Sequence, residues 1–152
     1  MTDLSAQLRE LTDRAAIIDL AVAYAAAVDN RDWDALAALF ADDAHWEHPA
    51  GKQRHEGPAA IVAYIGNAIE KLDATQHLNG NHVVTVRGDD AEHSCYYHAQ
   101  HIRRGTEGGD NFLAGGTYDD RLRRTPDGWR FVSRSVRGVW ADGNPAVLGL
   151  RS

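Results

Sequence analysis

A carboxylate at the end of an apolar helical stripe is the residue in this chain best placed to do chemistry. The stripe has alternating spacings of four and three residues, and the next position in the series is Asp29; its members are Leu4, Leu8, Leu11, Ala15, Ile18, Val22 and Ala25. Such spacing predicts one face of a helix, so Asp29 should point where a core residue would point. Because a buried carboxylate needs a hydrogen-bonding partner, we expect one, and we assign it to His77.

A His–Asp pair suits the removal of a proton next to an activating group. The aspartate would fix the imidazole tautomer and stabilise the imidazolium that forms. Asp29 also lies at a predicted helix C-terminus, where the macrodipole disfavours a negative charge and makes a histidine partner more necessary. The alternative is that Asp29 only caps the helix while His77 is a satisfied polar residue in a strand. The residues alone favour neither interpretation.

Three other side chains are candidates for substrate contact. Tyr24 could hydrogen-bond or protonate a leaving hydroxyl, or belong to the core. His98 lies on an unusually polar strand face, which either lines a barrel interior or faces solvent. The other residues of that face are Ser94, Tyr96 and Gln100. Arg134 could anchor an anionic or carbonyl-bearing substrate, although a surface arginine is the simpler interpretation.

Eight histidines raise the question of a metal site. His45 and Glu47 would share a strand face, with His48 and His55 nearby, but no HExxH-like helix or pair of cysteines supports them. We therefore expect no metal. The chain also lacks a phosphate loop and a GxSxG motif, so nucleotide and serine-hydrolase chemistry have no basis.

The composition predicts a single domain over residues 1–152 with a hydrophobic core. The 43% of hydrophobic residues suits a globular chain, and a net charge of -6 argues against a nucleic-acid groove. The lone Cys95 excludes an internal disulfide and is compatible with a reducing compartment. The longest strongly apolar segment, residues 20–28, is too short to cross a bilayer. We expect a cytoplasmic protein with no nucleic-acid or membrane partner.

The predicted elements form an α+β fold with three N-terminal helices packed on a curled, mostly antiparallel sheet. The helices are expected at residues 5–29, with a break near Thr12 and Asp13, at 33–40, and from Pro58 onward. The strands are expected at 45–48, 77–87, 91–104, 111–124 and 128–140. Gly115 and Gly116 are expected points of bending or close packing.

Three segments together resemble a known family over nearly the whole chain. They are YAAAVDNRDWDALAALFADDAHWEH, QHLNGNH and GGTYDDRLRRTPDGWRF. They are similar to the SnoaL-like branch of the NTF2-like superfamily, whose members include scytalone dehydratase, the lindane dehydrochlorinase, a bile-acid dehydratase and polyketide cyclases. The resemblance implies a cone-shaped α+β barrel with a mostly apolar pocket and no cofactor in the eliminating members.

The resemblance also implies roles for individual residues. Asp29 and His77 match the acid and the histidine of the dehydratase and dehydrochlorinase dyad, which favours the catalytic interpretation of the pair. Tyr24 matches a pocket tyrosine of the bile-acid enzyme. The other implied cavity-lining residues are Trp46, His98 and Arg134. The scytalone enzyme has a tyrosine near the place of Trp46, so one hydroxyl donor is missing here.

We therefore expect a cofactor-independent lyase or isomerase that acts on a small hydrophobic, cyclic compound. His77 would remove a proton, Asp29 would orient it, and Tyr24 or His98 would assist the leaving group or an enolate oxygen. The alternatives are a noncatalytic ligand-binding or association module and a polyketide-cyclase-like enzyme. An apolar outer face of the sheet predicts a homodimer or homotrimer. The residues expected on that face are Tyr97, Phe112 and Val139.

Overall fold

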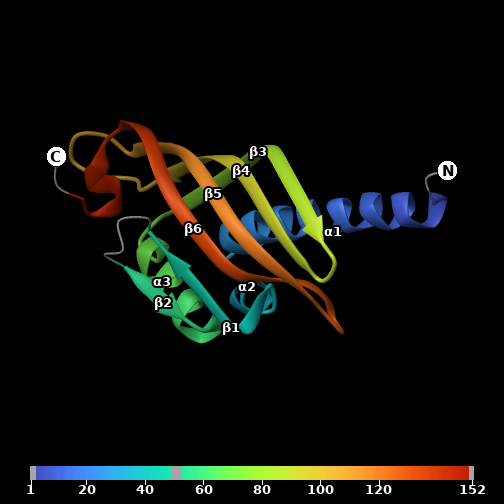
Figure 1. Cartoon of the computed structure of the whole chain (residues 1–152). Coiled ribbons are helices and arrows are strands. Elements are labelled where there is room, and N and C mark those ends of the chain that lie inside the picture. Colours follow the sequence, from blue (N-terminus) through green and yellow to red (C-terminus); the bar gives the residue numbers. More distant parts are fainter. Residues whose placement is uncertain (1–2, 49–52, 151–152) are drawn as a thin grey trace.

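The fold is a curled six-stranded sheet with three helices packed against its concave side (Figure 1). The computed structural model describes residues 3–48 and 53–150. The elements are α1 (Leu4–Asp29), α2 (Trp33–Ala37), β1 (Phe40–Glu47), β2 (Arg54–Glu56), α3 (Pro58–Ile69), β3 (Ala74–Arg87), β4 (Asp90–Ile102), β5 (Asn111–Thr125), β6 (Gly128–Gly143) and the 3₁₀ helix η1 (Pro145–Leu148). The strand order is β2-β1-β6-β5-β4-β3. Only the β1–β6 pairing is parallel among the described strand pairs. The α+β prediction is therefore confirmed, with a sheet that curls without closing.

Helix α1 is continuous over 26 residues. Its N-cap is Asp3, whose side chain accepts a hydrogen bond from the backbone N–H of Ser5. The predicted break near Thr12 is wrong, because the Thr12 hydroxyl donates to the carbonyl of Leu8 within the helix instead of capping a second one. No described helix combines the length and the apolar character that a membrane span requires.

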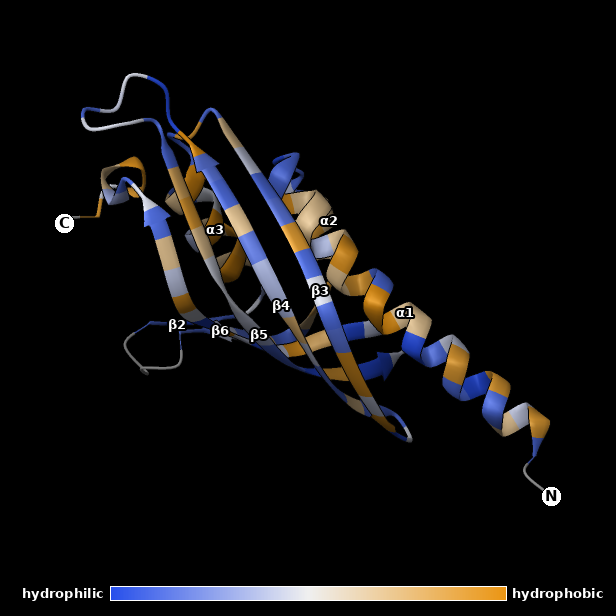
Figure 2. Cartoon of the chain, turned by 90° about the horizontal axis from the view of Figure 1, so that it is seen from above, coloured by the Kyte–Doolittle hydropathy of each residue, from blue (hydrophilic) through white to orange (hydrophobic). Residues whose placement is uncertain are grey.

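The face of α1 that packs on the sheet is not the stripe that ends at Asp29. Leu4, Leu8 and Leu11 are 77%, 62% and 64% exposed, whereas Ile17, Leu20, Tyr24 and Val28 are buried. The first half of α1 runs beyond the sheet and has no core to cover, so its hydrophobic residues face outward (Figures 1 and 2). The expectation that the stripe forms the inner face is therefore wrong.

A buried aspartate holds α1 to the sheet where the packed part begins. The Asp13 carboxylate accepts hydrogen bonds from both terminal nitrogens of Arg124, each at 2.7 Å, and from the indole N–H of Trp129 at 3.1 Å. The hydrogen bonds from Arg124 lower the pKa of Asp13 by more than burial raises it. Asp13 thus ties the helix to the β5–β6 hairpin and fixes the position of Asp29, four and a half turns later.

Strands β3 to β6, at the positions of the four long strands expected from the sequence, form an antiparallel meander, and the pleat alternates core and surface along each strand. The ladder between β5 and β6 shifts register at Gly115 and Gly116, where a Cβ would contact the Trp140 ring and the carbonyl of Arg137. The predicted bend is therefore confirmed.

The expected outer face of the sheet is only partly right. Tyr97 and Phe112 are buried on the inner face, because they occupy the core parity of β4 and β5, whereas Val139 is exposed.

Two shorter segments also differ from the expectation. β1 begins at Phe40, where helix α2 was expected to continue, and β2 was not expected.

Candidate active site

Asp29 and His77 meet at the point where α1 ends against β3. The His77 Nδ1 atom lies 2.7 Å from Asp29 Oδ1, and the His77 backbone N–H donates to Asp29 Oδ2 at 2.8 Å. Thr75, two residues earlier on the same face of β3, donates its hydroxyl to Asp29 Oδ1 at 3.0 Å. The side chains of Asp29 and His77 are only 20% and 10% exposed. The carboxylate is therefore held by three donors from one strand.

Arg31 supports this arrangement from behind the helix end. It adopts a left-handed backbone conformation with a φ of 57°, and its Nη1 atom donates to the carbonyls of Val28 and Asp29 and to the Thr75 hydroxyl. A guanidinium at a helix C-terminus compensates the negative end of the macrodipole. Thr75 accepts from Arg31 and so must give its own proton to Asp29.

The hydrogen bonds at Asp29 decide its charge. Burial acts to raise the pKa of Asp29, but the side-chain and backbone hydrogen bonds from His77, together with the one from Thr75, lower it below its ordinary value. Asp29 is thus a carboxylate at neutral pH and can only accept, which places the proton of a neutral His77 ring on Nδ1. The Nε2 atom is left without a proton and can act as a base.

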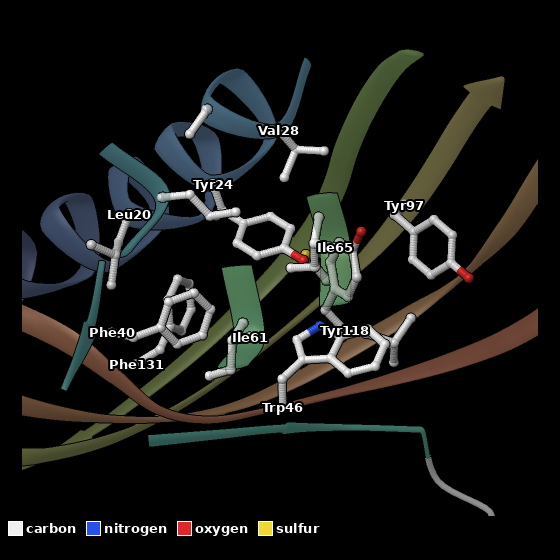
Figure 3. Packing of buried hydrophobic residues seen from close by; sticks show 14 of the residues in the cluster. Leu20, Tyr24, Val28, Phe40, Trp46, Ile61, Ile65, Tyr97, Tyr118 and Phe131 are labelled. Atoms are coloured by element: carbon white, nitrogen blue, oxygen red, sulfur yellow. The ribbon is translucent and has the colours of Figure 1, made fainter. Parts of the chain in front are cut away.

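His77 borders a pocket of about 450 Å³ between α1, α3 and the inner face of the sheet. Its wall is mostly apolar and aromatic, as the close view of the surrounding core shows (Figure 3). The lining residues include Tyr24, Val28, Trp46, His48, Tyr64, Ile65, His77, Tyr97, His101, Tyr118 and Leu148. A cavity of this size and character suits a small hydrophobic ligand.

Tyr24 and Trp46, both expected at the cavity, lie on its wall. The Tyr24 hydroxyl and the Trp46 indole nitrogen face the same part of the pocket, beside Ile65 (Figure 3). Burial raises the pKa of Tyr24, although the positive charge of Arg134 acts against it. Tyr24 therefore keeps its proton at neutral pH. The Trp46 Nε1 atom is buried and has no hydrogen-bond partner among the described residues, so it remains a free donor.

Two further histidines border the pocket, and the sequence pattern did not single them out for it. The Nδ1 atom of His48 lies 3.1 Å from the carbonyl of Val136, and that of His101 lies 3.2 Å from the carbonyl of Phe112. A carbonyl can only accept, so both Nδ1 atoms carry the proton of the neutral ring and both Nε2 atoms are acceptors. Burial lowers the pKa of His101 and keeps it neutral. His101 could have been located from the alternation along β4, because it lies two residues after the buried Ala99 and so faces the same side of the sheet.

His98 and Arg134 do not lie where the resemblance implied. His98 is exposed on the outer face of β4, edge-on to Trp140, because its parity is opposite to that of the buried residues of β4. Arg134 is fully buried and does not line the pocket; its guanidinium makes two hydrogen bonds to Asp120, at 2.7 and 2.8 Å, and lies over the ring of Tyr24. The expectation that His98 lines the cavity is wrong. Arg134 supports the pocket wall from behind.

The chain belongs to the SnoaL-like family, because the model of the SnoaL-like domain matches residues 9–135. An uncharacterised protein of Mycobacterium tuberculosis is 31% identical over 125 residues, which cover 82% of this chain and 84% of that protein. The fold is that of the NTF2-like superfamily.

Solved structures agree with this assignment. A protein of Novosphingobium aromaticivorans, described as a putative aromatic ring hydroxylase, is 28% identical with a TM-score of 0.80, and the match covers 91% of this chain and 97% of that one. A putative scytalone dehydratase of the same species is 22% identical with a TM-score of 0.79 over 89% of each chain. A hexachlorocyclohexane dehydrochlorinase of Novosphingobium barchaimii is 23% identical with a TM-score of 0.80 over 96% of this chain and 97% of that one. The last two show a shared fold.

Proposed function

We propose that the protein is a lyase or isomerase of the dehydratase type, in which His77 removes a proton from a small hydrophobic, cyclic compound. The observation that carries the proposal is the 2.7 Å hydrogen bond between His77 Nδ1 and Asp29, which leaves Nε2 unprotonated at the wall of an apolar pocket. The SnoaL-like family and the dehydratase and dehydrochlorinase among the structures of the same fold support a lyase.

The proposed step begins with transfer of a C–H proton from the substrate to His77 Nε2. The electron pair of that bond forms a new double bond or an enolate, while Asp29 stabilises the imidazolium. In an elimination, a hydroxyl on the neighbouring carbon takes a proton from Tyr24 and leaves as water. The free N–H of Trp46 would bind an oxygen of the substrate in the same part of the pocket. A halide leaving group would need no proton.

Solvent deuterium exchange tests the base without knowledge of the natural substrate. A panel of cyclic ketones and cyclic β-hydroxy ketones is incubated with the protein in D₂O, and deuterium uptake or loss of water is followed by mass spectrometry and proton NMR. Wild-type protein should accelerate exchange, and His77→Gln should reduce the rate by a factor of about 100 or more. His98→Asn is the matched control, since it changes an exposed histidine of the neighbouring strand, and should retain the wild-type rate.

Ligands that bind in the pocket with no exchange dependent on His77 would contradict the proposal. That result would favour the alternative from another class, a noncatalytic binding module that keeps the cavity for a ligand. Binding is measured separately by titration calorimetry or ligand-observed NMR, so an absence of chemistry is distinguished from an absence of binding.

We also propose that the protein assembles as a homodimer or homotrimer through the outer face of the sheet. Five large hydrophobic or aromatic residues are exposed there: Leu78, Val83, Tyr96, Val139 and Trp140. Light scattering coupled to size-exclusion chromatography should give two or three times the mass of one chain for wild type and the mass of a single chain for Val139→Glu. A monomeric wild type would contradict this proposal.

A further inference from the structure

A second cluster of chemically active side chains lies outside the pocket, on the inner side of β3 and β4. It consists of His82, His93 and Cys95, and one ligand atom of each lies within 4.8 Å of the others. His93 and Cys95 are buried and His82 is half-buried. None of the three borders the pocket that contains His77. The proposed reaction therefore leaves the cluster unused, and any role of the cluster is independent of that reaction.

A β-bulge brings His82 into the cluster. Gly80 pairs with Tyr96 and Val83 pairs with Ser94, so two residues of β3 oppose the single Cys95 of β4. The first of the two, Asn81, adopts a left-handed conformation with a φ of 54°. A bulge changes which residues of a strand face the core. Before the bulge the inward-facing residues have odd numbers, such as His77, and after it they have even numbers, such as His82 and Val84. A regular strand would not place His82 opposite Cys95.

His93 is oriented by a buried ion pair. Its Nδ1 atom lies 2.7 Å from Asp120 Oδ2, and Asp120 in turn accepts two hydrogen bonds from Arg134. The side chains of all three residues are fully buried. Because the carboxylate accepts the Nδ1 proton, the Nε2 atom of a neutral His93 carries no proton and accepts a hydrogen bond from His82 Nδ1 at 2.9 Å; a metal ion between the two nitrogens would take the place of that proton. A carboxylate on the far nitrogen is the usual support of a metal-binding histidine.

We propose that His82, His93 and Cys95 bind one divalent transition-metal ion of the zinc class. Two imidazole nitrogens and one thiolate are a ligand set that zinc and cobalt accept in tetrahedral geometry, with the fourth position available to water. On binding, the Cys95 thiol gives its proton to solvent. Asp120 and Arg134 form the supporting shell, and the ion joins the edge strand β3 to β4 at the bulge.

Two properties of the cluster favour an ion. The ligand atoms come from two adjacent strands and already lie within 4.8 Å of one another, with His82 Nδ1 and His93 Nε2 at 2.9 Å, so small side-chain movements bring them to the spacing of a tetrahedral site. The half-buried His82 also gives the ion a path from solvent. The sequence pattern predicted no metal, because the spacing of these residues matches no known motif; only His93 and Cys95 share a strand face in sequence.

Cobalt titration tests the site directly. Protein freed of metal by a chelator and kept reduced is titrated with Co²⁺ alone under anaerobic conditions, and the absorption spectrum is recorded. One equivalent should bind with a thiolate-to-cobalt charge-transfer band in the near ultraviolet and the visible bands of a tetrahedral ion. Zn²⁺ should displace it and abolish the bands.

Three variants separate this site from others. Cys95→Ser should lose the charge-transfer band, and His82→Asn, a change at a half-buried residue, should lose stoichiometric binding. His98→Asn should leave both unchanged. Circular dichroism checks that each variant folds, and Zn²⁺ should raise the unfolding temperature of wild type and His98→Asn only. A band that persists in Cys95→Ser, or equal binding by wild type and His82→Asn, would place the metal at other histidines and overturn the proposal, as would a folded wild type that binds no cobalt.

Discussion

Replacing Asp29 by Asn separates the charge of this side chain from its shape. The two oxygens of Asp29 accept hydrogen bonds from the ring and the backbone of His77, at 2.7 and 2.8 Å. A hydrogen bond to a charged group contributes about 1 kcal/mol more than a neutral one, so two such bonds lose about 2 kcal/mol. An amide costs less to bury than a carboxylate, which returns part of this loss. We expect Asp29→Asn to lower the free energy of unfolding by about 1–2 kcal/mol at pH 7.

The same variant predicts a pH dependence. Because the folded-state pKa of Asp29 is lowered by its hydrogen bonds, its charge stabilises the fold above the unfolded-state pKa of about 4, and this contribution is lost as the pH falls through the folded-state value. The difference between wild type and Asp29→Asn should therefore shrink as the pH is lowered from 7 toward about 3.

Urea denaturation followed by circular dichroism measures both effects. The midpoint should fall with an unchanged slope. Asp19→Asn is the control, since Asp19 is exposed on the same helix, and should stay within about 0.5 kcal/mol of wild type. Equal stability of Asp29→Asn and wild type at pH 7, or a difference that does not shrink in acid, would refute the argument that the charge of Asp29 is stabilised by His77.

Three further variants test the surroundings of the site. Gly116→Ala should destabilise the protein by about 1–3 kcal/mol in urea denaturation, since the new methyl group would collide with the carbonyl of Arg137; an unchanged midpoint would contradict the close packing at the bend. Arg134→Met should cost about 3–5 kcal/mol, because Asp120 is left buried without its cation, and adding Asp120→Asn should restore part of that loss. Trp46→Phe should weaken binding of a carbonyl-bearing ligand by about tenfold in calorimetry, because the indole N–H donor is lost, and should leave binding of a hydrocarbon ligand unchanged. Equal losses of affinity for the two ligands would contradict a hydrogen bond from Trp46.

The order and approximate bounds of the long strands could be predicted from local sequence patterns. The four long strands are separated by turns rich in Gly, Asp and Pro, and each expected range overlaps the observed strand closely. Gly115 and Gly116 signalled the bend because only residues without a side chain allow that approach of Trp140 and Arg137. The pattern did not reveal β2, whose three residues are too few to show a period.

The orientation of α1 was harder to predict, because a helix with two apolar stripes does not reveal which one meets the sheet. The stripe through Leu4, Leu8 and Leu11 has the more regular spacing, yet it faces outward because the sheet ends before it. Asp29 reaches His77 for a different reason. It is the last residue of the helix, only half-buried, and lies where the helix end meets β3.

The alternation of buried and exposed residues along a strand predicts some of the residues at the pocket but not all of them. Polar neighbours on the His98 face were a sign of solvent, while His101 shares the parity of the buried Tyr97 and Ala99. The bulge at Asn81 could not be foreseen, because the strand reads as continuous on either side of it. The burial of Arg134 depends on Asp120, whose partnership is visible only once β5 and β6 are paired.

The position of the proton on the His77 ring tests the central claim most directly. Long-range nitrogen–proton NMR of ¹⁵N-labelled protein distinguishes the two neutral tautomers. We predict a proton on Nδ1 and a bare Nε2 in wild type. Asp29→Asn should reverse this, because the Asn amide would accept from the His77 backbone and donate to Nδ1. A wild-type ring that carries its neutral proton on Nε2 would leave His77 unable to accept the substrate proton at that atom and would contradict the proposed function.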